Sequence, residues 1–193
     1  MAATESTMLG LGTSAPEFHL PDVVSGKTVS PGTLSGGKAL LVVFISPHCP
    51  YVKHIQDGIA AMARDYSRED LRMVAISSND AAQYPDDAPE GLRRMALELG
   101  FDFPFCFDET QETAKAYRAA CTPDFFLFDG GRKLVYRGQF DDARPRNAVP
   151  VTGADLRAAI DAVLAGNPVS ERQKPSLGCN IKWKPGNAPE YFR

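Results

Sequence analysis

A strand-to-helix junction holds the most informative stretch of the sequence, Phe44-Ile45-Ser46-Pro47-His48-Cys49-Pro50-Tyr51-Val52. The apolar run before it, ALLVVFI at 39–45, predicts a buried strand. A helical pattern begins at Pro50, and proline is favoured at the first helical position because its missing N–H would have no partner there. The sequence therefore predicts that Cys49 lies between a central strand and the first turn of a helix.

This position suits a reactive thiol. The first N–H groups of a helix lack internal partners and carry partial positive charge. A sulfur there can lose its proton well below the ordinary cysteine pKa, and the thiolate is the nucleophile. We therefore predict that Cys49 is reactive, with His48 stabilising the thiolate or moving its proton. The alternative is an inert core cysteine, which is a common fate of free thiols.

The remaining elements predict an α/β fold with a mixed central sheet flanked by helices. Strands and helices alternate in the first half of the chain, which favours parallel pairing, and a hairpin comes after them. Asp129-Gly130-Gly131-Arg132 is the predicted hairpin turn. The predicted strands are 71–77, a piece within 101–107, 125–128 and 133–137; the predicted helices are 50–67, 89–99, 110–120 and 154–165.

Length and pattern predict one domain with an appended segment. The 193 residues suit a single domain, which we place at 1–166. Residues 167–193 show no periodicity and contain four prolines, so we expect an extended C-terminal tail packed on the domain. Cys179 lies within this tail.

Composition excludes several classes of protein. A net charge of −3 gives no electrostatic case for binding nucleic acid or an anionic membrane. No apolar run approaches the roughly 18 residues of a membrane helix, and the first residues lack the basic start of a secretory signal. We therefore expect a cytoplasmic protein with no nucleic-acid or membrane partner. The four cysteines lack the paired spacing of a zinc site.

The order of elements, with a cysteine that starts a helix and a Thr-Pro before the hairpin, resembles the thioredoxin fold. The opening 12–22, GTSAPEFHLPD, resembles the peroxiredoxin-like (alkyl hydroperoxide reductase/thiol-specific antioxidant) branch. The segments 48–54, 123–129 and 178–184 are similar to those of uncharacterised bacterial redoxins in that branch. The resemblance covers nearly the whole chain.

The resemblance implies a thiol-dependent oxidoreductase with one cysteine at the usual motif. Thioredoxins use two cysteines separated by two residues. If Cys49 is the first, attacking cysteine of this motif, Val52 holds the position of the second. If Cys49 is the second cysteine, Ser46 holds the position of the first. Peroxiredoxins place Thr or Ser three residues before the reactive cysteine, which Ser46 matches. Their proline would fall at Val42, and their arginine would fall near Pro123.

The resemblance also implies a cis peptide bond before Pro123, with its loop against the reactive thiol. Cys121 would then lie on the rim of the site, as either a second reactive thiol or a packed apolar residue. The backbone at Thr122, together with Ser46, would offer hydrogen bonds to the attacking group. Cys179 could resolve an oxidised Cys49 from the tail, or it could merely anchor the tail. Cys106, between two phenylalanines, is expected in the core.

These features lead to one main functional hypothesis. Cys49 thiolate would attack a small peroxide, or a protein or low-molecular-weight disulfide, and would be reset by Cys121, by Cys179, or by an external thiol such as thioredoxin or glutathione. No cofactor is expected. A metal held by Cys49 with the nearby histidines lacks an evident fourth ligand. The alternatives are a non-catalytic redox sensor or chaperone that binds thiols or metal, and a scaffold without turnover. Cys121 could also link a homodimer.

Two acidic loops complete the predictions. Asp86 and Asp87 lie in one of them, and Asp141 and Asp142 lie in the other. Charged residues in loops are usually solvated, so we expect both pairs on the surface.

Overall fold

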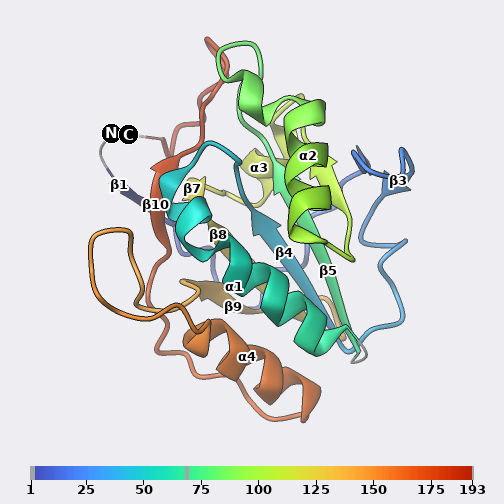
Figure 1. The fold of residues 1–193 in the computed structure, drawn as a ribbon. Helices are drawn as coiled ribbons and strands as arrows, with labels where there is room; N and C mark the ends of the chain where they lie inside the picture. Colours follow the sequence, from blue (N-terminus) through green and yellow to red (C-terminus); the bar gives the residue numbers. More distant parts are fainter. Residues whose placement is uncertain (1–2, 68–69, 193) are drawn as a thin grey trace.

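The computed structural model describes residues 3–67 and 70–192, and shows the predicted α/β architecture (Figure 1). Residues 1 and 193, the outer ends of the predicted ranges 1–166 and 167–193, lie outside the described residues. The central sheet has the strand order β6-β5-β4-β8-β9. Strands β4, β5 and β6 run parallel, whereas β8 and β9 are antiparallel to their neighbours. The strands are β4 (Ala39–Phe44), β5 (Leu71–Ser77), β6 (Phe105–Phe107), β8 (Asp124–Asp129) and β9 (Leu134–Gly138).

Strand β4 organises the core because its side chains alternate between two buried faces. Leu41 and Val43 point into one hydrophobic cluster, and Leu40, Val42 and Phe44 point into the other. Every residue of β4 is buried, as expected for a central strand covered on both sides. The predicted run 39–45 is thus confirmed as the middle of the sheet.

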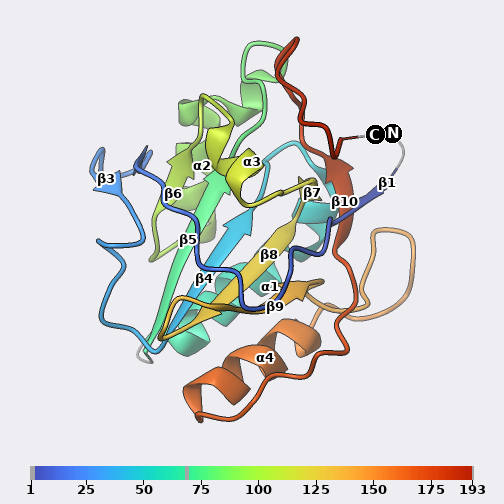
Figure 2. The ribbon, with the colours of Figure 1, turned by 180° about the vertical axis from the view of Figure 1, so that it is seen from behind.

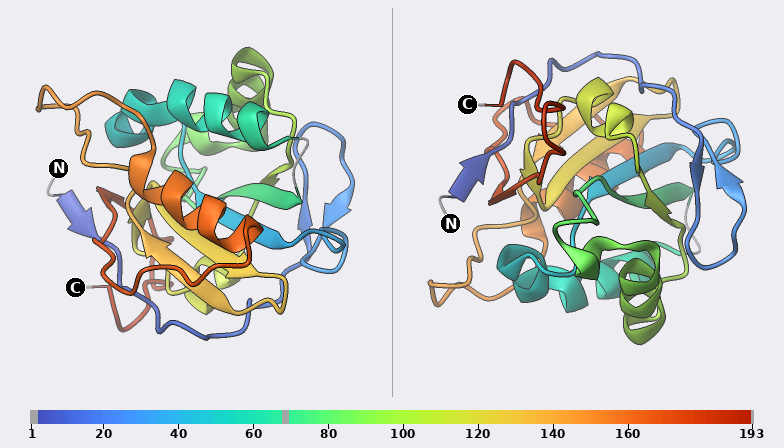
Figure 3. Two further views of the ribbon diagram at one scale, coloured as in Figure 1. Left: turned by 90° about the horizontal axis from the view of Figure 1, so that it is seen from below. Right: turned by 90° about the horizontal axis from the view of Figure 1, so that it is seen from above.

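Three helices cover the first face, and Figure 3 shows α1 and α4 side by side on it. Their bounds are α1 Pro50–Tyr66, α2 Pro89–Leu99 and α4 Ala154–Leu164. The Tyr66 hydroxyl donates to Asp161 Oδ1 at 2.5 Å, which joins the ends of α1 and α4. Helix α2 ends at Gly100, whose φ of 64° is the left-handed conformation that glycine adopts without strain.

The second face is covered by α3 (Glu112–Ala116) and by the N-terminal segment, which crosses it in Figure 2. Tyr117 comes directly after α3 and packs on Phe44 and Phe126, with ring centroids 5.7 and 5.6 Å away. Helix α3 is shorter than the predicted helix 110–120. The chain leaves helical geometry at Arg118, where φ is 51°, and this lets Tyr117 turn into the core.

The other short elements lie at the edges. Strands β2 (Leu20–Pro21) and β3 (Thr28–Val29) form a small hairpin. The loop after β5 contains one 3-10 turn, η1 (Pro85–Asp87), directly before α2. No helix in the described residues is long and apolar enough to cross a membrane.

The C-terminal segment differs from the prediction because it contains a strand. Strand β10 (Leu177–Asn180) lies between β1 (Ala3–Glu5) and β7 (Cys121–Thr122) in a separate three-stranded sheet. Figures 1 and 2 show β1 and β10 side by side in this small sheet. A strand of four residues is too short to carry a clear periodicity in the sequence. The tail is therefore held by backbone pairing as well as by side chains.

We predict that Phe44→Ala lowers the free energy of unfolding by about 3–5 kcal/mol, the usual effect of removing a fully buried phenylalanine. The Phe44 side chain is wholly inaccessible and contacts Tyr117 and Phe126. Urea unfolding followed by circular dichroism measures the change. Leu97→Ala is the control because Leu97 is 59% exposed, and its effect should stay within about 0.5 kcal/mol. Equal effects of the two variants would contradict this account of the core.

Candidate functional site: a buried pair of thiols

Cys49 occupies the N-cap of α1, the junction that the sequence indicates. Its own backbone is extended, with φ −74° and ψ 120°, and Pro50 is the first helical residue. The Cys49 carbonyl accepts the first helical hydrogen bond from Lys53 N–H at 2.9 Å. The side chain is fully buried, so the thiol lies under the surface.

The loop before β8 brings a carbonyl group to this sulfur. The Thr122–Pro123 peptide bond is cis, as the resemblance implies. The Cys49 Sγ lies 3.0 Å from the Thr122 carbonyl oxygen, and as a thiol it donates to that oxygen. The predicted proximity of this loop to Cys49 is therefore observed.

Strand β10 brings a second thiol to the same place. Cys179 is directly opposite Thr122 in the antiparallel pairing of β10 with β7. Directly opposite residues in an antiparallel pair project their side chains to the same side of the sheet. The Cys179 side chain consequently lies on the Cys49 side of β10, and its thiol is the largest cause that lowers the pKa of Cys49. Both side chains belong to one hydrophobic cluster with α1.

This arrangement lowers the pKa of Cys49 to about 5. The hydrogen bond from the Cys179 thiol is the largest cause, and burial opposes it. The Thr122 side chain and the backbone N–H groups of Val52 and Cys179 lower the pKa further. The Thr122 carbonyl acts in the other direction, because an acceptor favours the protonated thiol. The donors outnumber this acceptor, and a thiolate is favoured at Cys49.

Cys179 responds in the opposite direction. Its pKa is raised above the ordinary cysteine value, first because its proton is held by Cys49, and then because of burial and the adjacent Cys49 charge. The pair thus carries one negative charge, which resides on Cys49, and one proton, which resides on Cys179. A pair of this kind has one nucleophile and one protonated neighbour.

Cys121 is a close neighbour of this pair, and the charges of Cys49 and Cys179 help to raise its pKa. It precedes Thr122 on β7, and successive residues of a strand project to opposite sides. Its thiol is 3.5 Å from the Pro123 carbonyl, and its side chain is fully buried. Burial, together with the nearby Asp124 carboxyl, raises the pKa of Cys121. The structure therefore supports the packed alternative for Cys121 more than a reactive one.

Asp124 is a residue that the sequence reasoning missed. It is completely buried at the start of β8, and burial raises its pKa to about 8 despite a hydrogen bond from Ala120 N–H. Within the described part of the chain, its Oδ1 has no hydrogen-bond partner. Its position after Pro123 on an apolar strand was the available signal, because an aspartate there interrupts a buried run.

His48 contacts a carboxylate that was expected on the surface. Asp87 is fully buried and forms a short contact with His48 Nδ1, so the prediction of a solvated loop is wrong at Asp87. The His48 ring also stacks on Tyr84, with centroids 4.9 Å apart. Ser46 Oγ lies 3.1 Å from the same Nδ1 and is directed to His48. His48 is not among the largest causes of the lowered Cys49 pKa.

In the second acidic loop, too, one of the two aspartates is buried. Asp141 is buried, and its Oδ2 accepts hydrogen bonds from Thr152 and Gly153 N–H at 2.7 and 2.6 Å. It thereby ties the loop 141–153 to the start of α4. The prediction of a solvated pair holds for Asp142 and is wrong for Asp141, because backbone N–H groups replace its water.

Two further sequence predictions concern the burial of Cys106 and a metal site at Cys49. Cys106 is buried in the second cluster, as predicted, and burial raises its pKa to about 12. Among residues 3–67 and 70–192, no group of three or more His, Cys, Asp or Glu side chains is placed to hold a metal ion.

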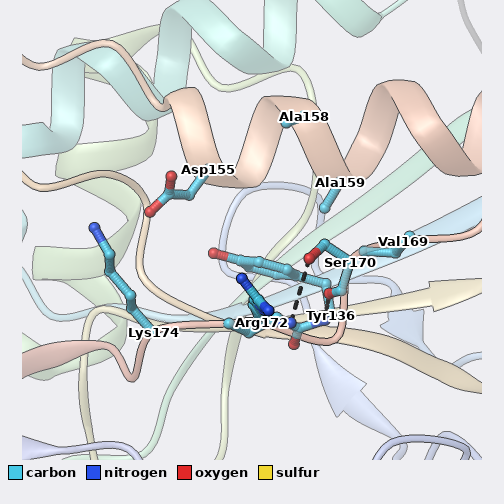
Figure 4. A pocket seen from close by; sticks show the side chains of 9 residues that line it. Tyr136, Asp155, Ala158, Ala159, Val169, Ser170, Arg172 and Lys174 are labelled. Atoms are coloured by element: carbon cyan, nitrogen blue, oxygen red, sulfur yellow. Dashed lines mark hydrogen bonds between the residues drawn. The ribbon is translucent and has the colours of Figure 1, made fainter.

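Two hollows in the surface differ in their relation to the thiols. One lies between α4 and the segment 169–174, and Figure 4 shows Tyr136, Asp155 and Lys174 lining it. None of the described residues that line it is a cysteine. A smaller one has Tyr51, Pro123 and Leu177 among its lining residues, and neither Cys49 nor Cys179 lines it. The second is the hollow that adjoins α1, the cis-proline loop and β10 together.

The same elements are shared with a known family. Residues 11–156 match the model of the family described as Redoxin. The chain belongs to the Redoxin family. The match spans the Cys49 junction, the cis-proline loop and the start of α4, and it ends before β10.

Solved structures of relatives share the fold. An uncharacterized conserved protein from Geobacillus kaustophilus is 54% identical, with a TM-score of 0.94 over 96% of this chain and 98% of that one. The thioredoxin domain of a thiol-disulfide oxidoreductase from Bacteroides vulgatus is 18% identical, with a TM-score of 0.57 over 67% of this chain and 88% of that one. The second likeness establishes the thioredoxin fold of this redoxin.

One curated relative also matches this redoxin. Methylamine utilization protein MauD from Paracoccus denitrificans is 30% identical over 122 residues, which are 62% of this chain and 54% of MauD. The chain thus spans about half the length of that relative.

We predict that the Cys49 thiolate forms with a midpoint near pH 5. The signal, thiolate ultraviolet absorbance, should rise as pH rises through that value and stay level through the ordinary cysteine range near 8.5, because the pKa values of the other three thiols are raised. In Cys179→Ala the midpoint should shift upward, because the principal donor to the sulfur is lost. Cys106→Ala is the matched control and should titrate as the unsubstituted protein does. An unchanged midpoint in Cys179→Ala would show that Cys179 does not set the Cys49 pKa.

Proposed function

We propose that this redoxin is a thiol-dependent oxidoreductase in which the Cys49 thiolate attacks a peroxide or a disulfide. The observation that carries the proposal is the position of Cys49 at the start of α1, where Cys179 and Thr122 stabilise its thiolate. Thiolate attack is the first step of both reactions. Family membership supports a redox role but does not distinguish the two substrates.

Each reaction leaves a defined product on Cys49. With a hydroperoxide, the thiolate takes the terminal oxygen and becomes a sulfenate, and the other oxygen leaves with a proton as an alcohol or water. With a disulfide, the thiolate displaces one sulfur as a thiol and forms a mixed disulfide. An external thiol such as thioredoxin or glutathione supplies the two electrons that return Cys49 to the thiolate.

The surroundings of Cys49 favour a small or an extended substrate. Cys49 is fully buried, and a small hollow is lined by residues of the same elements, Tyr51 of α1, Pro123 of the cis-proline loop and Leu177 of β10. Tyr51 lies on the first turn of α1, so a molecule entering there would meet the helix start. The proposal includes a cytoplasmic setting, where such reductants are abundant.

A non-catalytic redox sensor is the second candidate, and the burial of Cys49 is the observation that favours it. A sensor would be oxidised once and would hold its oxidised form, whereas an enzyme would consume many equivalents of substrate. Turnover in the presence of excess reductant therefore separates the two functions.

We predict that the protein consumes hydrogen peroxide or oxidised glutathione repeatedly when a thiol reductant is supplied, and that Cys49→Ser abolishes this consumption. The loss is expected because a serine hydroxyl does not ionise in the accessible pH range. Peroxide or glutathione assays measure the rate, and mass spectrometry after one equivalent of oxidant locates the modified residue.

Cys106→Ala is the control for the loss of a buried cysteine, and it should retain turnover. A single Cys49-dependent oxidation without turnover would support the sensor. Equal rates in the unsubstituted protein and Cys49→Ser would contradict both candidates.

A further inference from the structure

The pairing of β10 with β7 gives the tail cysteine a defined position. Cys179 is in register with Thr122, and the Thr122 carbonyl lies 3.0 Å from Cys49 Sγ. Strand β10 is held on its other side by β1, where Ala3 pairs with Cys179. Cys179 is thus the centre of a three-stranded sheet and not part of a loose end.

We propose that Cys179 is the resolving thiol of Cys49, so that α1 and the C-terminal strand together form a two-cysteine redox centre. This inference rests on the proposed function, since it concerns the step after oxidation of Cys49. It places the second sulfur about 130 residues away in sequence, at Cys179, while the position within the helix turn is occupied by Val52.

The resolving step balances for each substrate. Cys179 sulfur attacks the sulfur of Cys49 sulfenic acid, the S–O bond breaks, and the departing hydroxide takes the Cys179 proton and leaves as water. With a mixed disulfide, Cys179 displaces the substrate sulfur, which leaves with that proton as a thiol. Both routes form a Cys49–Cys179 disulfide, and an external dithiol then reduces it while becoming a disulfide itself.

The charge distribution sets the order of these events. While Cys49 is a thiolate, its charge and its hold on the Cys179 proton keep the Cys179 pKa raised. Oxidation of Cys49 removes two of the causes that raise the Cys179 pKa, the hold on its proton and the adjacent charge, while burial still raises it and the nearby Lys182 lowers it. The Lys182 ammonium is anchored to the Asn180 carbonyl and side chain at 2.8 and 2.9 Å. Cys179 therefore keeps its proton while Cys49 is a thiolate.

The alternative resolving residue, Cys121, is disfavoured by strand geometry. It pairs with Asn180, and Asn180 and Cys179 are successive residues whose side chains project to opposite sides of β10. A bridge requires Cβ vectors that converge, with Cα atoms within about 7 Å. The alternation along β7 therefore directs the Cys121 side chain to the other side of the strand from Thr122, the residue opposite Cys179.

The first test maps the disulfide in the full-length protein. One equivalent of hydrogen peroxide is added, free thiols are blocked, and a non-reducing digest is analysed by mass spectrometry. We expect a Cys49–Cys179 peptide, and in Cys179→Ser a persistent Cys49 sulfenate that dimedone traps. Cys121→Ala and Cys106→Ala should both form the Cys49–Cys179 bridge.

The outcomes separate this inference from the proposed function. A Cys49–Cys121 bridge, or a stable sulfenate in the unsubstituted protein, would overturn the role of Cys179 while leaving Cys49 as the reacting thiol. An unmodified Cys49 would overturn both.

The second test changes the register contact and keeps every cysteine. A Cβ added at Gly178 would overlap the Thr122 carbonyl and the Pro123 nitrogen, so Gly178→Ala must move β10 away from β7. We expect bridge formation to be about 100-fold slower, the effect of displacing reacting groups by about 1 Å. Sulfenate formation at Cys49 should also slow in this variant, because Cys49 loses the donor that lowers its pKa, so the bridge rate is measured from the point at which the sulfenate has formed.

Gly32→Ala is the matched control, because a Cβ there meets only Ser30 Oγ at an ordinary 3.5 Å. It should form the bridge at the unsubstituted rate. Bridge formation at that same rate in Gly178→Ala would show that the β10–β7 register does not present Cys179.

Discussion

The backbone pairing of β10 with β7 is the interaction on which the candidate site depends. It places Cys179 opposite Thr122, and Thr122 in turn contacts the Cys49 sulfur. Without this pairing, Cys49 would lose the main donor that lowers its pKa. Gly178 permits the approach, because any larger residue would overlap the Thr122 carbonyl.

The central sheet supplies the fixed half of this arrangement. Strand β4 is buried on both faces and delivers the chain to Cys49, while β8 begins directly after the cis-proline. Strands β4 and β8 are paired, with Phe44 opposite Asp124. The loop that follows β4 and the cis-proline loop that precedes β8 are therefore held at the same end of these strands. The C-terminal strand is the separate element that completes the site.

The fold was largely predictable because its elements are long and strongly patterned. The apolar run at 39–45 and the helix from Pro50 have clear patterns, and Gly100 ends α2 where expected. The prediction failed where the pattern is short. Strand β10 has four residues, α3 has five, and the buried state of Asp87 depends on a histidine 39 positions away.

By itself the sequence determined which residue is the candidate nucleophile, because the strand-to-helix junction at Cys49 is a local feature. Only the tertiary structure decided which thiol accompanies it. From the sequence alone, Cys121 and Cys179 were both candidates for the second thiol. Spacing along the chain does not show to which side of a strand a sulfur projects. The antiparallel register of β10 with β7 places Cys179 beside Cys49, and the alternation of side chains along β7 directs Cys121 away.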